Sequence, residues 1–463
     1  MESAAWLFTG LELAMQEVAL FAAFGFLMLG ASDLIVDFLW FWLLFSKRLG
    51  PDKAFDRDIA RLSEGRATTG LMAVFVPAWD EADVIEPMLA QALLRFSPGE
   101  FRLYVGCYPN DPETIAAVLR VADPRVRLVV GSAPGPTTKA DCLNRLWEAL
   151  LDDERAEARR ARAIILHDAE DVVHSAELAI FDRLIGQFDL VQLPVLPLID
   201  DNSRWIAGHY IDEFAESHAK ELVVRAAVGA GLPSAGVGCA FARDALERLA
   251  ERAGGLPFDA ESLTEDYELG LRLRAMGGRA AFVRSFGVES RSLVATREYF
   301  PGTIDAAVSQ KARWMIGIAL SGWDRLGWTG GLAERWMRLR DRQSVLAALV
   351  LLAGYCALLS WALLEARNIL LGVPAPPPPA FLQMLLWLNA MLFTWRLAMR
   401  FGFVSRTYGW REGLRSLPRV VVGNAIAMLA ARRAVLRYRH SRRTGRTRWD
   451  KTIHAFPSAM PAE

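Results

Sequence analysis

The chain has 463 residues, enough for two or three structural units, and its 53 basic and 53 acidic residues balance. This balance argues against a protein that binds nucleic acid through overall positive charge. Hydrophobic residues make up 53% of the chain and include 15 Trp, so we expect a globular domain joined to membrane segments. The four cysteines form no metal-binding spacing, and we interpret them as free thiols of a domain in a reducing cytosol.

Residues 1–48 are predicted to form an N-terminal transmembrane segment. The apolar stretch Val18–Phe45 is long enough to cross a bilayer, and Lys47 and Arg48 follow it directly. Because basic residues flank the cytoplasmic end of a span, we expect the N-terminus outside and the following domain in the cytoplasm.

Two acidic residues, Asp33 and Asp37, lie within this apolar stretch and share one helical face. Ionisable groups in a span usually face protein or water rather than lipid. The alternative is that this half of the helix leaves the hydrocarbon and lies at the membrane interface. The sequence does not distinguish between these two interpretations.

Residues 49–318 are predicted to form a cytoplasmic catalytic domain. Short apolar runs alternate there with stretches of helical periodicity, such as 82–96 and 111–121. Alternation of this kind predicts an α/β domain, with a mainly parallel sheet and helices on both faces. The runs expected to form strands are Leu71–Val76, Phe101–Val105, Val126–Val130, Ile164–Leu166 and Leu190–Leu193.

The remainder of the chain is predicted to alternate between the membrane surface and the bilayer. Residues 319–344 mix Trp with Arg and Asp, which predicts an interfacial helix, and residues 345–400 contain two transmembrane helices. Residues 401–448 are expected at the interface. A crossing at Val420–Ala431 would place the basic stretch Arg432–Lys451 outside, against the charge rule. That stretch either binds anionic lipid headgroups or is a solvated tail.

An acidic cluster, Asp168, Glu170 and Asp171, directly follows the apolar run Ile164–Leu166. In open α/β sheets, ligands bind just outside the carboxyl ends of the strands. Carboxylates at this position suit a hard divalent cation that shares its oxygen ligands with a phosphate. The cluster therefore predicts a metal–diphosphate site, and the alternative is a surface turn rich in acids.

Two further stretches carry charged residues near predicted helix starts. Lys139 follows a Gly/Pro-rich loop and is either a phosphate ligand or a surface lysine. In SLTEDYELG, Ser262 or Thr264 can cap a helix, and Glu265 can complete a capping box from Ser262. Asp266 then lies in the first turn. The alternative interpretation is that both acids only complement the helix dipole.

Two more stretches can contribute to a ligand site. The small residues of Ser234–Phe241 allow the backbone to approach a ligand closely. In QKARW, Gln310–Trp314, Arg313 offers two parallel donors to diphosphate oxygens and Trp314 offers a flat face to a sugar ring. An isolated Arg-Trp pair near a membrane is more often an interface anchor.

Taken in order, these motifs resemble the family 2 glycosyltransferases with a GT-A fold, of the membrane-embedded, processive polysaccharide-synthase type. The markers are HDAED in place of the DxD metal motif, TED at Thr264–Asp266, and Q-x-x-R-W at Gln310–Trp314, flanked by membrane segments. The resemblance is closer still to the inner-membrane phage-adsorption protein B (NfrB-type) branch. Proteins of that branch carry a further C-terminal domain similar to cyclic-di-GMP receptors. Since this chain ends at Glu463 without one, we expect either that another chain supplies cyclic-di-GMP control or that such control is lacking.

The resemblance implies an inverting transfer from a nucleotide sugar, expected to be a UDP-N-acetylhexosamine, to a growing glycan or a lipid acceptor. It implies that Asp80, Asn110 and Asp111 hold the base and ribose of the donor, and that Lys139 approaches the nucleotide.

The resemblance also implies a Mg²⁺ or Mn²⁺ ion on the diphosphate, held by Asp168 with either Glu170 or Asp171. Asp266, next to Glu265 in the catalytic TED motif, would be the general base that takes the proton of the acceptor hydroxyl.

The remaining implied contacts lie in QKARW and in the tail. Arg313 would neutralise the leaving diphosphate, and Trp314, with Gln310 in the same motif, would bind the acceptor. Residues 449–463 resemble the gating loop of these synthases. The tail residues expected near the nucleotide are Trp449, Lys451 and His454. The alternative is a docking tail that makes no contact with nucleotide.

The family implies a multi-pass protein of the bacterial inner membrane whose spans form a path for the product. Two other functions remain open. One is a single-addition transferase that loads a polyprenyl carrier. The other is a scaffold without catalysis that docks an outer-membrane, porin-like phage receptor.

Overall fold

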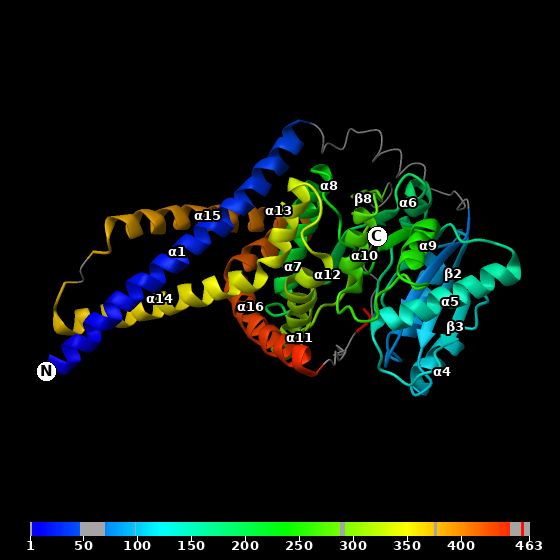
Figure 1. Cartoon of the computed structure of the whole chain (residues 1–463), viewed down its shortest axis with the longest axis horizontal. Helices are drawn as coiled ribbons and strands as arrows, with labels where there is room; N and C mark the ends of the chain where they lie inside the picture. The colour runs from blue at the N-terminus through cyan, green and yellow to red at the C-terminus, as the bar shows by residue number, and fades with distance from the viewer. Residues whose placement is uncertain are drawn as a thin grey trace.

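The computed structural model describes residues 2–46, 70–97, 99–287, 292–374, 377–444 and 455–457. A globular α/β part is joined to long helices that extend away from it (Figure 1). Three helices of the described residues are long and apolar enough to cross a membrane: α1 (Glu2–Phe45), α14 (Ser344–Leu371) and α15 (Ala380–Tyr408). Helix α1 packs against both α14 and α15, and the three coincide with the stretches predicted to span.

The globular part is built on a seven-stranded mixed sheet with strand order β3-β2-β1-β4-β7-β5-β8. Only β7 among these strands is antiparallel to its neighbours, so the predicted α/β fold with a mainly parallel sheet is confirmed. A second sheet pairs β6 with β9 in parallel. The strands are β1 (Met72–Pro77), β2 (Phe101–Cys107), β3 (Val126–Val130), β4 (Ala163–Leu166), β5 (Leu190–Gln192), β6 (Val195–Pro197), β7 (Cys239–Ala242), β8 (Ala280–Phe282) and β9 (Thr296–Glu298).

Helices cover both faces of the sheet because successive strand residues point to opposite sides. In β1, Met72, Val74 and Val76 pack under α3, α4 and α6, whereas Ala73 and Phe75 pack under α5, α9 and α10. The helices of the first face are α3 (Ile85–Arg95), α4 (Pro112–Arg120) and α6 (Glu177–Leu184). Those of the second are α5 (Lys139–Glu157), α9 (Arg243–Arg252) and α10 (Glu265–Ala275).

A further set of helices lies between the sheet and the spans. Two of them, η1 and η2, are π-helices, a form that frequently occurs at functional sites. This set comprises α7 (Gly208–Glu216), η1 (Ser217–Glu221), α8 (Leu222–Ala227), α11 (Ile304–Trp314), η2 (Met315–Ser321), α12 (Gly322–Leu326) and α13 (Leu332–Arg342). The stretch expected to form one interfacial helix is therefore divided among η2, α12 and α13.

The last described helix, α16 (Trp410–Thr444), is continuous through Pro418. The apolar stretch Val420–Ala431 lies within it and is not among the candidate spans of the described residues. Its side chains Ile426 and Ala430 instead pack in a core with α11 and η2. Figure 1 shows α16 beside α11.

Asp33 and Asp37 both face protein. Asp37 is 4% exposed; its Oδ1 lies 2.5 Å from Lys220 Nζ, and its Oδ2 accepts a hydrogen bond from Trp395 Nε1 at 2.8 Å. Asp33 forms ion pairs with Arg340, at 3.0 Å, and with Arg396.

These groups belong to one set of charges that joins the spans to the globular part. Lys220 also contacts Glu216 Oε1 at 2.7 Å, and Arg400 Nε lies 3.5 Å from Glu216 Oε2. We call this set the junction cluster. It consists of Asp33, Asp37, Glu216, Lys220, Arg340, Arg396 and Arg400.

Candidate active site

Strand β4 lies between β1 and β7 in the sheet, and the HDAED loop begins where β4 ends. Asp168 and Glu170 line a cavity at this edge of the sheet. Lys139, the first residue of α5, lines the same cavity and forms an ion pair with Asp168. Thr138 caps α5 by accepting a hydrogen bond from Asp141 N at 3.2 Å. The cap fixes the helix start that places Lys139 beside Asp168.

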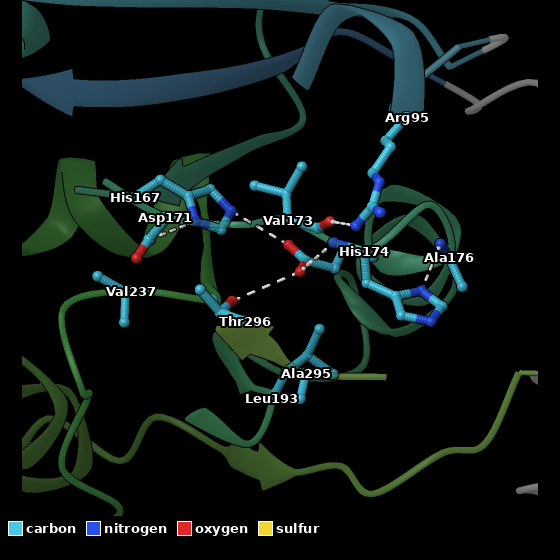
Figure 2. A network of polar contacts seen from close by, with 12 residues as sticks. Arg95, His167, Asp171, Val173, His174, Ala176, Leu193, Val237, Ala295 and Thr296 are labelled. Carbon is cyan, nitrogen blue, oxygen red and sulfur yellow. Dashed lines mark hydrogen bonds and ion pairs between the residues drawn. The ribbon is translucent and has the colours of Figure 1, made fainter. Parts of the chain in front are cut away.

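Asp171 differs from the two preceding acids because its side chain is fully buried. Its Oδ2 accepts a hydrogen bond from Asp168 N at 3.0 Å and lies 2.7 Å from His167 Nδ1 (Figure 2). The other ring nitrogen of His167 lies 3.1 Å from Glu177 Oε2. Burial by itself lowers the pKa of His167. The carboxylates of Asp171 and Glu177 raise it by more, so the pKa of His167 is about 10. Asp171 is therefore engaged beneath the loop, whereas Glu170 lines the cavity.

The TED motif lies at the start of α10, with Thr264 as the N-cap residue. Asp266 Oδ1 accepts a hydrogen bond from Tyr267 N at 2.7 Å. A Cβ at Gly236 would lie 2.7 Å from Asp266 Oδ2, so only a residue without a side chain fits there. The small-residue loop predicted to approach a ligand therefore packs on the Asp266 carboxylate.

The expected capping box at this helix is wrong. The Thr264 side chain makes no capping hydrogen bond, and Ser262 Oγ donates instead to Glu268 Oε1 at 2.7 Å. Glu268 is buried and also pairs with Arg272 and Arg325. The hydroxyl predicted to cap the helix thus belongs to a buried ionic network that the sequence pattern did not reveal.

The acids of TED are electrostatically coupled to Lys139. Burial and repulsion by Asp266 raise the pKa of Glu265 to about 7. Burial also raises the pKa of Asp266, while Lys139 opposes the shift. Burial lowers the pKa of Lys139, but Asp168, Glu265 and Asp266 raise it more, so the amine stays charged. Two cations, Lys139 and Arg313, thus lie among a larger number of carboxyl groups.

The QKARW motif occupies the last turns of α11, and Gln310, Arg313 and Trp314 all line the cavity. Lys311 contacts both carboxylate oxygens of Glu213 on α7 at 2.6 Å, which orients the helix. The π-helix η2 begins immediately after Trp314, and its Gly317 leaves no room for a side chain against Thr264. This contact places the TED and QKARW motifs side by side.

The residues predicted to hold the nucleoside order the strand-end loops. Asp111 Oδ2 accepts a hydrogen bond from Asp80 N at 2.6 Å, and Oδ1 accepts one from Thr114 N at 3.3 Å. Asn110 exchanges two hydrogen bonds with the backbone of Gly135, at 2.9 and 2.7 Å. None of Asp80, Asn110 and Asp111 is among the residues that line the cavity.

Trp79 was not predicted as a site residue, although it lies only two residues after the end of β1. It lines the cavity, and its ring meets that of Tyr108 edge to face, with centroids 5.2 Å apart. A Cβ at Gly135 would lie 2.6 Å from the Trp79 ring, so this loop packs closely on the indole. Its position at the end of a predicted strand was the available signal.

Glu298, at the end of β9, is a second unpredicted residue of the cavity. Two backbone hydrogen bonds between Val172 and Arg297, at 2.7 and 3.1 Å, bring β9 beside the HDAED loop. Burial, and then the nearby Asp171, Glu170 and Asp168, raise the pKa of Glu298 well above its ordinary value. The local sequence around Glu298 does not reveal this approach.

The cavity has a volume of about 1480 Å³ and extends from these residues into the membrane helices. Its walls on that side include Gln16 of α1, Trp361 and Asn368 of α14, and Asn389 of α15. The residues of the junction cluster line the same cavity. The motifs of the globular part and the three candidate spans therefore share one continuous space.

The tail residues Trp449, Lys451 and His454 lie outside the described residues. Closely following them, Phe456 packs against the core on the sheet face that α3, α4 and α6 cover, and Pro457 is buried. The tail thus returns to the globular part after α16.

The acids at the end of β4 fit a divalent cation bound together with a diphosphate. Among the described residues, no three His, Cys, Asp or Glu side chains form a metal-binding group by themselves. Magnesium sites commonly use one or two carboxylates and complete their coordination with substrate phosphates and water. Asp168 and Glu170 supply such an oxygen donor pair on the cavity wall.

Comparisons with known proteins show the family of the chain. The family model described as Glycosyltransferase like family 2 matches residues 69–317. Bacteriophage adsorption protein B of Escherichia coli (strain K12) and Bacteriophage N4 adsorption protein B of Escherichia coli O157:H7 are each 35% identical over 451 residues. The match covers 93% of this chain and 60% of either relative, so the chain spans about 60% of their length.

A solved structure has the same fold. A mannosyltransferase from Pyrobaculum calidifontis, solved with GDP-Man and Mn²⁺, superposes with a TM-score of 0.54 at 17% identity. The superposition covers 89% of this chain and 99% of that one, and therefore includes the helices beyond the sheet. The GT-A-like sheet and the predicted family resemblance are thus confirmed, and the chain belongs to the family 2 glycosyltransferases.

Proposed function

We propose that the chain is a membrane-embedded, inverting glycosyltransferase that lengthens a glycan with sugar from a UDP-N-acetylhexosamine. The observation that carries this proposal is the single cavity. It joins the acids at the strand ends to polar side chains among the membrane helices. Polar groups within spans commonly mark a substrate path. Together, the two ends provide a donor site and a route for a growing acceptor.

The donor would lie across the carboxyl ends of β1 and β4, as ligands of open α/β sheets do. Trp79 lines this end and offers its indole face to the base. Asp80, Asn110 and Asp111 would act mainly by ordering the surrounding loops, since Asp111 and Asn110 hold backbone groups. Lys139 and Arg313 would provide positive charge to the diphosphate.

Asp168 and Glu170 would hold Mg²⁺ or Mn²⁺ on that diphosphate, because both line the cavity. When bound, the cation supplies Lewis-acid charge neutralisation to the leaving group. Asp171 would keep its place beneath the loop, where its Oδ2 accepts a hydrogen bond from Asp168 N.

Asp266 would act as the general base. Its carboxylate takes the proton of the acceptor hydroxyl, whose oxygen forms the new bond to the anomeric carbon while the bond from that carbon to the diphosphate breaks. Arg313 receives the charge that develops on the departing diphosphate, and Trp314 faces the acceptor sugar. Glu265, whose raised pKa favours the protonated form more than usual, limits the negative charge beside the base.

We further propose that the protein lies in the bacterial inner membrane, with its N-terminus outside and the catalytic domain in the cytoplasm. The basic stretch Arg432–Lys451 would contact anionic lipid headgroups. The curated relatives are named for bacteriophage adsorption. A porin-like outer-membrane partner and cyclic-di-GMP control through another chain are the interactions that their resemblance suggests for this protein.

The test is to incubate the full chain in nanodiscs with Mg²⁺ or Mn²⁺ and a panel of UDP-sugars and GDP-Man. Released nucleotide and product size are measured. Release from one donor, with a polymer that grows over time, is the expected result, and Asp266→Asn is the matched control. A single small lipid-linked product would instead indicate a transferase that loads a polyprenyl carrier. Failure to bind or turn over any donor, even with cyclic-di-GMP and the partner present, would favour a scaffold without catalysis.

A further inference from the structure

His167 lies between two buried carboxylates beneath the HDAED loop, and the proposed reaction does not use it. Its Nδ1 is 2.7 Å from Asp171 Oδ2, and its Nε2 is 3.1 Å from Glu177 Oε2. All three side chains are fully buried. They come from the end of β4, the loop and the first turn of α6, so one ring ties three successive parts of the chain together (Figure 2).

The contacts define the chemistry of this ring. An ionised carboxylate only accepts hydrogen bonds, whereas a neutral imidazole has one donor and one acceptor nitrogen. When both carboxylates are ionised, satisfying both contacts requires a proton on each nitrogen and thus a cation between two anions. Loss of the ring would leave two uncompensated buried carboxylates, which is strongly unfavourable.

Each carboxylate in turn holds the backbone of the loop. Asp171 Oδ2 accepts from Asp168 N at 3.0 Å, and Glu177 Oε1 accepts from His174 N at 2.8 Å. Thr296 Oγ1 donates to Glu177 Oε1 at 3.4 Å, which adds a link to β9. The segment that carries Asp168 and Glu170 is therefore held at both ends through the same imidazole.

Other side chains fix the middle of the segment. Gln91 accepts from Val173 N at 3.2 Å and donates to Val173 O at 3.1 Å. Arg95 Nη1 also donates to Val173 O at 2.6 Å (Figure 2). These contacts hold Val173 from α3, but the turn containing Asp168 and Glu170 lies before it and depends on Asp171.

We propose that His167 is a positioning residue that, through Asp171 and Glu177, sets the turn presenting Asp168 and Glu170 to the divalent cation. The inference rests on the metal site of the proposed function. Within HDAED, His167 and Asp171 would hold the turn in place, and Asp168 and Glu170 would bind the cation. Glu177, a residue outside the recognised motifs, would also have a supporting role.

The expected size of the effect follows from known metal sites. Loss of an outer-shell partner that orients a ligand typically costs about 10–100-fold in metal affinity. We expect His167→Gln to weaken Mn²⁺ binding within this range, because the glutamine amide carries no charge and cannot satisfy both carboxylates in the same way. A histidine that only fills the core would affect stability and leave Mn²⁺ affinity unchanged.

The loop offers a matched control in His174, which is also buried. Its Nδ1 accepts a hydrogen bond from Ala176 N at 3.1 Å, so the ring braces the start of α6 (Figure 2). His174→Gln removes a buried ring of the same size from the same loop. We expect it to lower the melting temperature while Mn²⁺ affinity stays within about two-fold of the original chain.

The experiment measures Mn²⁺ binding to the full chain in detergent, by the electron paramagnetic resonance signal of free Mn²⁺ in the presence of UDP. Thermal melting is followed in parallel. The variants are His167→Gln, His174→Gln and the double change His167→Gln with Glu177→Gln. Since the second change removes one of the two opposed carboxylate charges, the double variant should regain part of the lost affinity. This rescue is a result that a purely structural role would not produce.

Equal Mn²⁺ affinity in the original chain and in His167→Gln would overturn the inference, as would an equal loss in His174→Gln. If His167→Gln does not fold, Glu177→Gln takes its place, with at least a several-fold loss expected and an unchanged affinity overturning the inference. Asp168→Asn separates this inference from the proposed function. If Asp168→Asn binds Mn²⁺ as the original chain does, the metal site itself is wrong and the inference falls with it.

Discussion

The junction cluster and the active-site cluster both contain several partly or fully buried charged side chains, but they balance charge differently. The active-site cluster consists of Lys139, Asp168, Glu170, Glu265, Asp266, Glu298 and Arg313. In the junction cluster, Lys220 lies 2.5 Å from Asp37 and 2.7 Å from Glu216, and Asp33 pairs with two arginines. Each of these three carboxylates therefore has a cation from another part of the structure or from the next helical turn. Such a cluster stabilises one arrangement of helices and leaves little charge for a ligand.

The active-site cluster lacks this balance. Lys139 pairs with Asp168, while the nearby acids Glu265, Asp266 and Glu298 all have raised pKa values. Excess negative charge is unfavourable in the protein alone and becomes favourable when a divalent cation binds. The comparison suggests a general criterion: neutralised buried charges hold a fold together, whereas uncompensated ones indicate where a charged ligand binds.

The largest expected effect is a loss of turnover when an acid of the active-site cluster is changed. Asp266→Asn should lower turnover by about 10²–10⁴-fold, because a positioned general base contributes that much. The asparagine Oδ1 can still accept from Tyr267 N, so the start of α10 should remain intact. Rates of UDP release at saturating donor would measure the loss, and unchanged UDP affinity would show that the fold is kept. Near-normal turnover would assign the base to another residue.

The second prediction concerns metal affinity. Asp168→Asn should weaken Mn²⁺ binding by more than the roughly 10–100-fold that loss of an outer-shell partner costs, because a proposed ligand is removed. Glu170→Gln should have a similar effect. Titration of Mn²⁺ by calorimetry in the presence of UDP would measure both. Asp37→Asn in the junction cluster is the control, and a comparable loss there would contradict the distinction between the clusters.

The third prediction concerns stability, for which the junction cluster should show the larger effect. Asp37→Asn should lower stability by about 1.5–3 kcal/mol, because a charged hydrogen-bond partner of buried Lys220 is neutralised while Glu216 remains. Tryptophan fluorescence during thermal or denaturant unfolding in detergent would report the change. Asp168→Asn should be neutral or stabilising in the same assay. If both variants destabilised the chain equally, charge balance would not distinguish a structural cluster from a functional one.

The two clusters also show which features could be predicted from the sequence. Strands β1 to β5 and the HDAED, TED and QKARW motifs could be recognised, because each depends on residues that are close in the sequence, whereas the short strands β6 to β9 were not predicted. The apolar run Ile164–Leu166 corresponds to β4, and Lys139 begins a helix as expected. Leu269 and Leu273 are buried in the core, as the periodicity of α10 requires.

Contacts between distant segments could not be predicted in this way. Asp33 and Asp37 were recognisable as an exception in an apolar helix, but nothing near them identifies Lys220 or Arg396 as partners. Likewise, Glu298 reaches the HDAED loop only because β9 bridges to Val172. Alternation of apolar and polar residues determines which face of an element is buried, but not which distant element covers it.

The fourth prediction uses the pH dependence of the active-site cluster. Burial raises the pKa of Asp266, and the base must be deprotonated to act. Acidification should therefore lower turnover at a higher pH than it would if the base were an ordinary aspartate with a pKa of about 3.9. Lys139 lowers the pKa of Asp266, so Lys139→Met should move this acid limb to still higher pH. Profiles of kcat against pH would test the sign, and a shift to lower pH would contradict it. Asp37→Asn should leave the limb in place.

The smallest expected effect tests whether the junction ion pairs stabilise the fold because they are buried, and not only because they are ion pairs. Arg120 and Glu86 pair at 2.7 Å on the surface, with side chains 56% and 43% exposed. Exposed pairs typically contribute about 0.2–1 kcal/mol, because water already solvates both charges and salt screens their attraction. Arg120→Ala should therefore change the free energy of unfolding by less than Asp37→Asn does, and the small change should shrink further as salt is added. Denaturant unfolding at low and high salt would measure both variants side by side. If Arg120→Ala cost as much as Asp37→Asn, burial would not be what makes the junction charges structural, and the contrast with the active site would then depend on charge balance alone.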